Sequence, residues 1–113
     1  MTYIHDFRFF LSDSSFVDAI IEYNANTFDA ELILPPLPPN PSRFLNRAST
    51  SFQTAADAFN WVVQEILAYA TSNSLSIAWV DNPCNTPFIS ETEQTSVFQT
   101  KGITVTLLVN GKK

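Results

Sequence analysis

The sequence predicts a single α+β domain over residues 1–113, in which one long helix, at about residues 51–71, packs on a mostly antiparallel sheet. The expected order of elements is β-β-β-linker-α-β-β-β. Three observations lead to this prediction: a helical repeat of apolar residues in the middle of the chain, alternating apolar segments on both sides of it, and a proline-rich connector at residues 35–42. Apolar residues make up 45% of the chain, which is enough for the core of one domain of this length.

Three segments before the connector alternate between apolar and polar residues, as strands with one buried face do. They are residues 3–11, 16–23 and 27–34. The middle segment is ambiguous, because a short helix would also gather its apolar residues on one side. Its β-branched and aromatic residues favour a strand, and the turn-forming residues 24–26 then predict a three-stranded antiparallel meander.

The connector holds five prolines within residues 35–41, which cannot donate the hydrogen bonds of a sheet. Residues 42–48 are expected to lead from it into the helix. Between residues 52 and 70 the apolar residues recur at i, i+3, i+4 and i+7, the spacing of one helical face. The hydroxyl residues 49–51 are candidates for the N-cap, and the polar run 71–74 is expected to end the helix.

The last third of the chain is expected to add strands. Residues 75–79 alternate as a short strand, and residues 81–94 are expected to form an irregular loop. Residues 95–100 and 103–109 are expected to be two strands, and in the second of them apolar residues at 103, 105, 107 and 109 alternate with Thr104 and Thr106. The sequence therefore predicts a final hairpin that turns around Lys101–Gly102.

The charge of the chain is negative and unevenly distributed. The formal net charge is −5, and six of the eleven acidic residues precede residue 42, where Arg8 is the single basic residue. A chain without a basic field is not expected to bind nucleic acid directly. No apolar run is long enough for a membrane span, and the charged residues near the N-terminus do not suit a signal peptide. The expected location is the cytoplasm.

The sequence contains few candidate catalytic residues. The chain has one histidine, His5, on the apolar face of the first predicted strand, where a buried structural histidine is the simpler interpretation. The one cysteine, Cys84, has no basic neighbour in sequence that would lower the pKa of its thiol. No carboxylates have the spacing of metal ligands, and no glycine-rich loop precedes the helix. We therefore expect no catalytic residues, no metal and no cofactor, and an enzyme is the less favoured possibility.

Two segments are candidates for binding a partner. Trp61 falls on the side of the predicted helix opposite the buried stripe, a position that suits an interface with another protein, unless the proline segment or residues 81–94 cover it. Its neighbours on that side are Asp57, Glu65 and Ala68. The second candidate is the P-x-x-P-x-R pattern formed by Pro38, Pro41 and Arg43, which resembles ligands of aromatic-grooved domains but also suits a stiff connector.

The sequence thus favours a non-enzymatic protein–protein interaction module of the cytoplasm, which binds another protein or a second copy of itself and neither a membrane nor nucleic acid. The alternative is a small-ligand-binding domain or an enzyme with a phenylalanine-lined cleft between helix and sheet. A weaker alternative is an acidic decoy that occupies the nucleic-acid site of a basic protein. A decoy would need its carboxylates gathered densely on one surface.

Overall fold

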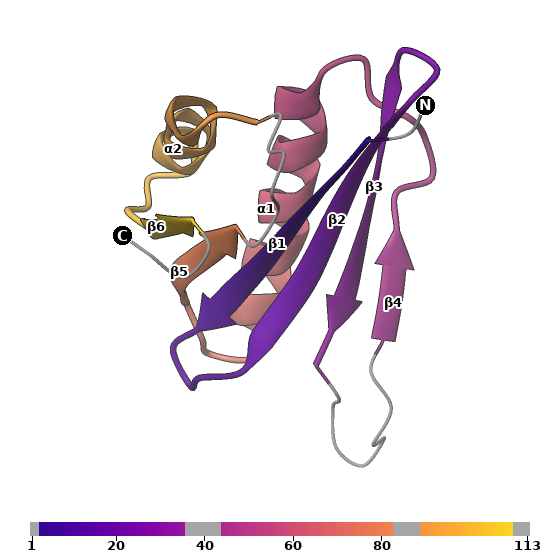
Figure 1. Ribbon diagram of the computed structural model, residues 1–113. Coiled ribbons are helices and arrows are strands. Elements are labelled where there is room, and N and C mark those ends of the chain that lie inside the picture. The colour runs from indigo at the N-terminus through magenta and orange to yellow at the C-terminus, as the bar shows by residue number, and fades with distance from the viewer. Residues whose placement is uncertain (1–2, 36–43, 83–88, 110–113) are drawn as a thin grey trace.

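A computed structural model describes residues 3–35, 44–82 and 89–109 as one mixed sheet with two helices (Figure 1). The elements in chain order are β1 (Tyr3–Leu11), β2 (Phe16–Asn24), β3 (Thr27–Leu34), β4 (Phe44–Arg47), α1 (Ala55–Ser72), β5 (Ile77–Asn82), α2 (Glu91–Thr100) and β6 (Thr106–Val109). The strands form one sheet in the order β4-β3-β2-β1-β5-β6. All neighbouring strands are antiparallel except β5 and β6, which are parallel.

The predicted antiparallel meander of the first three strands is confirmed, and residues 16–24 form a strand rather than a helix. The turn between β2 and β3 has two central residues with positive φ, Ala25 at 53° and Asn26 at 71°. Two positive φ values define the type I′ turn, whose twist matches that of a two-stranded hairpin. The turn thereby fixes the register in which Asn24 lies opposite Thr27.

The long helix exists but begins later than predicted. It starts at Ala55 rather than near residue 51, because Thr54 is the N-cap and its hydroxyl accepts a hydrogen bond from the backbone N–H of Asp57 at 3.0 Å. Phe52, which was expected inside the helix, instead pairs its backbone with Phe28 in an isolated antiparallel bridge. The hydroxyl residues 49–51 were therefore the wrong choice of cap.

Residues 44–47 form a strand, β4, where the sequence predicted only a lead into the helix. This segment pairs with β3 at the edge of the sheet, with Glu31 opposite Arg47. Two hydrogen bonds from the Arg47 guanidinium to one oxygen of Glu31, of 2.8 and 3.1 Å, join the two strands. Four residues are too few for alternation to distinguish a strand from a loop, so this edge strand could be recognised only through its partner.

The predicted loop 81–94 is wrong at both of its ends, while residues 83–88 lie outside the described residues, and the predicted strand 95–100 is also wrong. Asp81 and Asn82 belong to β5, and residues 91–100 form the helix α2. A capping box begins α2: the Ser90 hydroxyl accepts from the backbone N–H of Glu93, and the Glu93 carboxylate accepts from the backbone N–H of Ser90, both at 3.1 Å. This S-x-x-E signature was present in the sequence and outweighs the strand propensity of the threonine and valine that follow.

The predicted final hairpin is wrong for the same reason. Gly102, with φ of +74°, ends α2 rather than turning a hairpin, and its neighbour Ile103 donates its N–H to the carbonyl of Phe98 at 3.2 Å. Strand β6 is shorter than predicted and begins at Thr106. The helix α2 carries the chain across the sheet between β5 and β6, which makes this pair parallel.

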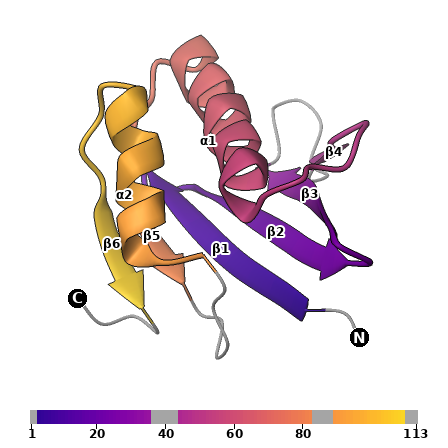
Figure 2. The same ribbon diagram turned by 90° about the horizontal axis from the view of Figure 1, so that it is seen from above.

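Both helices lie on the same face of the sheet (Figure 2). Between α1 and the sheet, Phe59 contacts Phe7 and Phe9 of β1 and Phe98 of α2, with ring centroids 5.1, 6.0 and 5.6 Å apart. These four rings are at most 1% exposed. These rings lie between α1 and the sheet, where the alternative hypothesis expected a phenylalanine-lined cleft. In the described parts of the chain, neither helix is long and apolar enough to cross a membrane.

A buried polar network attaches the C-terminal elements to the sheet. His5 of β1 hydrogen-bonds through Nε2 to Oδ1 of Asn82 at 2.9 Å, and Gln94 of α2 donates to the same oxygen at 3.0 Å. The Asn82 amide in turn donates to the carbonyl of Leu108 in β6 at 3.2 Å. These three side chains are at most 2% exposed, so each hydrogen bond replaces one that water would otherwise make. The network connects β1, β5, α2 and β6.

Candidate functional site

The face of the sheet opposite the helices is the candidate site. Among the described residues, no helix or strand covers it (Figure 2). Successive side chains of a strand point to opposite faces of the sheet. The buried side chains point toward the helices, so the side chains between them point toward this opposite face. We call this surface the outer face and define it by the side chains of Ile4, Asp6, Arg8, Phe10, Phe16, Asp18, Ile20, Glu22, Asp29, Glu31, Ile33, Leu45, Arg47, Trp79 and Asp81.

Apolar side chains form part of the outer face. Ile4 and Leu45 are 46% and 55% exposed, and they are the exposed large hydrophobic residues within the described ranges. At one end of the face the rings of Phe10 and Trp79 stack with centroids 4.8 Å apart, and Phe16 lies 5.9 Å from Phe10. A face that mixes exposed aliphatic groups with half-buried aromatic rings has the composition of many protein interfaces.

The charges of the outer face are mostly negative. It carries six carboxylates, those of Asp6, Asp18, Glu22, Asp29, Glu31 and Asp81, and two guanidinium groups, those of Arg8 and Arg47. The Arg8 Nε lies 2.8 Å from Asp18 Oδ1, and the Arg8 guanidinium lies 4.2 Å from the centre of the Phe16 ring. Arg47 pairs with Glu31 at 2.8 Å. Because all of these ion pairs are partly exposed, each contributes at most about 1 kcal/mol to stability.

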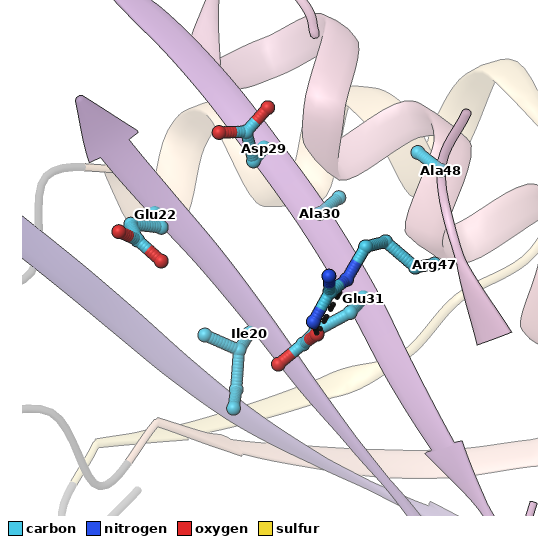
Figure 3. Close-up of a pocket in the computed structure, with 7 residues that line it drawn as sticks. All are labelled: Ile20, Glu22, Asp29, Ala30, Glu31, Arg47 and Ala48. Carbon is cyan, nitrogen blue, oxygen red and sulfur yellow. Dashed lines mark hydrogen bonds and ion pairs between the residues drawn. The ribbon is translucent and has the colours of Figure 1, made fainter. Parts of the chain in front are cut away.

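Two depressions hollow the outer face on either side of Ile20. The first, between β2, β3 and β4, is lined by Glu22, Asp29, Glu31 and Arg47 around Ile20 (Figure 3). We call it the β3 depression. The second, which we call the β1 depression, is lined by Asp6, Arg8, Asp18, Asp81, Ile20 and Ile33. Each depression therefore combines three carboxylates, one arginine and an aliphatic wall.

The residues predicted to bind a partner on the helix are not part of this face. Trp61 is half-buried, and its ring centroid lies 6.3 Å from that of Phe52. Phe52, in the segment before the helix, therefore partly covers Trp61. From the sequence, only the proline segment and residues 81–94 were expected as possible covers. Glu65 is half-buried and accepts a hydrogen bond from Asn46 at 3.1 Å. Asp57 and Ala68 are exposed. Pro38, Pro41, Arg43 and Cys84 lie outside the described residues, so the hypotheses that involve them stay predictions.

The sequence contained a weak signal of the outer face. Alternation placed Asp18 and Glu22, and likewise Asp29 and Glu31, on the polar sides of their strands, where solvated charge was the simpler interpretation. Only the strand order and register show that these residues are neighbours. Within residues 3–35, 44–82 and 89–109, no three His, Cys, Asp or Glu side chains are placed to hold one metal ion.

His5 lies on the helix side of the sheet, where it is buried and its contacts are those of a structural residue. Its ring stacks on Phe7 with centroids 4.1 Å apart. The backbone N–H of Ile89 donates to Nδ1 at 3.4 Å, so the proton of the neutral ring is on Nε2, which donates to Asn82. Burial lowers the pKa of His5 below its ordinary value of 6.5, against smaller opposing effects of the Asn82 hydrogen bond and the Asp6 charge.

Because the folded protein holds His5 neutral, stability should depend on pH. Below about pH 6.5 the unfolded chain binds a proton that the folded chain does not, so the free energy of unfolding should fall as pH decreases from 6.5 toward the folded-state pKa. The slope should be at most about 1.4 kcal/mol per pH unit. Urea unfolding between about pH 7.5 and 5.5 measures it. In the variant His5→Gln this slope should disappear, and an unchanged slope in the variant would contradict the assignment.

Comparisons of the chain with protein-family models, with curated proteins and with solved structures found no match. Function is therefore inferred from the geometry and chemistry of the outer face.

Proposed function

We propose that this chain is a non-enzymatic protein–protein interaction module of the cytoplasm, and that it binds another protein through the outer face of its sheet. One observation carries the proposal. Of the large hydrophobic side chains in the described ranges, the two that are exposed, Ile4 and Leu45, both lie on this face. Exposed aliphatic side chains are unfavourable in water, and a sheet face usually packs against another layer. A face that carries both of these residues and has no covering helix or strand among the described residues is therefore suited to an interaction with a partner.

The helix side is the less favoured location. Its interior is filled by closely packed phenylalanine rings, and Trp61, the residue that made the helix a candidate interface, is half-buried beside Phe52. A buried anchor residue has less apolar area left to contribute to a partner.

Site-specific crosslinking tests which side binds. A photoreactive phenylalanine analogue placed at Leu45 should form a discrete adduct with one protein in an extract of the native cells, because this position is 55% exposed on the outer face. The matched control carries the same analogue at Ala68, an exposed position of α1 on the opposite side of the molecule, and should form no such adduct. Adducts from Ala68 and none from Leu45 would move the interface to the helix.

The acidic decoy is a second candidate, because six carboxylates gather on the outer face and a decoy requires such a surface. The two candidates differ in whether nucleic acid competes for the partner. A partner crosslinked at Leu45 that is displaced by added duplex DNA or RNA would favour the decoy, whereas a partner that is unaffected by them would leave the simpler interaction module.

A further inference from the structure

We propose that the partner of the outer face is a protein that presents lysine and arginine side chains to it, and that two of these side chains enter the β3 and β1 depressions. This inference rests on the proposed function, because it assigns a chemistry to the partner of the same face. It depends on the charge of the face, on one pair of carboxylates in its register and on the shape of the two depressions.

The outer face is strongly negative. Six carboxylates and two arginines leave four negative charges in excess on this one surface. A surface with one dominant sign of charge attracts partners of the opposite sign and repels those of its own sign.

Two of the carboxylates lie directly opposite each other. Glu22 of β2 is the cross-strand neighbour of Asp29 of β3. Like charges in directly opposed positions destabilise a sheet. The Asp29 carboxylate accepts a hydrogen bond from the Ser51 hydroxyl, but neither residue forms an ion pair with any residue of the described ranges. A cationic group from a partner would offset this repulsion. The free energy that the repulsion costs the free protein would then favour binding.

The depressions match the shape of basic side chains. Ile20 forms an aliphatic wall of both, and carboxylates stand around it: Glu22, Asp29 and Glu31 in the β3 depression (Figure 3), and Asp6, Asp18 and Asp81 in the β1 depression. Lysine and arginine have an aliphatic stem and a cationic end, so the stem can lie against Ile20 while the end reaches the carboxylates. In the β3 depression Glu31 is paired with Arg47, and in the β1 depression Asp18 is paired with Arg8. Glu22 and Asp29 line the β3 depression beside its ion pair.

A second copy of the chain is a poor occupant. In a two-fold contact the same patch meets itself, so the outer face would place its own carboxylates against those of its partner. Such a contact opposes like charges across the interface, which costs binding free energy. The charge thus selects a different, basic protein.

Fluorescence anisotropy with the full chain tests the inference. The probe is a fluorescein-labelled peptide of about twelve residues in which arginine and serine alternate. It should bind in about 50 mM salt and bind at least about fivefold more weakly in about 300 mM, because salt screens exposed charges. The double variant Glu22→Gln/Asp29→Asn should bind the probe at least about fivefold more weakly than the parent. Its melting temperature should not fall, because the substitutions remove a repulsion.

The matched control removes two charges elsewhere. Asp13 in the β1–β2 turn and Glu91 at the start of α2 are exposed and not part of the outer face. The variant Asp13→Asn/Glu91→Gln should bind the probe within about twofold of the parent, although its net charge changes equally. If both double variants weaken binding equally, or if the probe does not bind in low salt, the inference is overturned.

Failure of the inference is distinguishable from failure of the proposed function. A crosslinked partner at Leu45 together with no probe binding would leave the outer face as an interface and refute its cationic partner. A doubled mass in size-exclusion chromatography that the variant Leu45→Asp returns to the monomer would assign the face to a second copy and also overturn the inference.

Discussion

Replacing Phe59 by alanine should lower the free energy of unfolding by about 3–5 kcal/mol, the largest effect of a single core substitution that we expect in this protein. The Phe59 ring is fully buried and contacts Phe7, Phe9 and Phe98, so its removal leaves a cavity where α1, β1 and α2 meet. The lost burial and the cavity both destabilise the fold, because surrounding side chains relax only partly into such a space. Urea unfolding followed by circular dichroism measures the loss.

The control for this substitution is Phe16→Ala. Phe16 is half-buried on the outer face, where its ring contacts Phe10 and the Arg8 guanidinium. Because water can fill the space that its ring leaves, this change should cost clearly less, about 1–2 kcal/mol. Equal losses in the two variants would show that the interior between α1 and the sheet is not the main core.

The substitution Asn82→Ala should cost about 3 kcal/mol or more, although it removes only a small polar side chain. Asn82 accepts hydrogen bonds from His5 and Gln94 and donates one to the Leu108 carbonyl. Without it, these partners stay buried and lose a hydrogen bond, and each buried group without a partner costs about 1–3 kcal/mol. The exposed Asn24 provides the control: Asn24→Ala should change stability by no more than about 0.5 kcal/mol.

Hydrogen exchange adds a spatial readout to the Asn82→Ala experiment. The network joins α2 and β6 to β1 and β5, so the amides of α2 and β6 should lose protection more than those of β2 and β3. A uniform loss of protection across the whole sheet would indicate that the network stabilises the fold in general and does not specifically attach the C-terminal elements.

Local sequence patterns, each contained in a single segment of the chain, were sufficient to predict the first half of the fold. Alternation in β1, β2 and β3 and the turn residues at 24–26 predicted the meander, and the helical repeat predicted α1. These patterns are reliable because the residues on a buried face must be apolar. They therefore recur in the sequence with the period of the strand or the helix. The start of α1 was missed by a few residues, because three hydroxyl residues precede Thr54 and only the tertiary bridge at Phe52 selects among them.

The second half depended on contacts that are distant in sequence. Residues 95–100 have strand propensity but form α2, because the capping box at Ser90 and Glu93 begins a helix whose Val97 and Phe98 are buried. Asn82 and Gln94 link β5 and α2 to β1 and β6 through hydrogen bonds whose partners are up to 77 residues apart. Propensity is a weak preference, and long-range burial and hydrogen bonding override it.

The candidate site shows the same division. By itself the sequence determined that the protein is acidic and that Asp18, Glu22, Asp29 and Glu31 lie on the polar sides of their strands. Only the tertiary structure decided that these side chains share one face with Asp6 and Asp81 and that both helices lie on the other. The physical reason is that the period of a strand fixes the side of each residue, whereas strand order and register, which are set by pairing between segments, fix its neighbours.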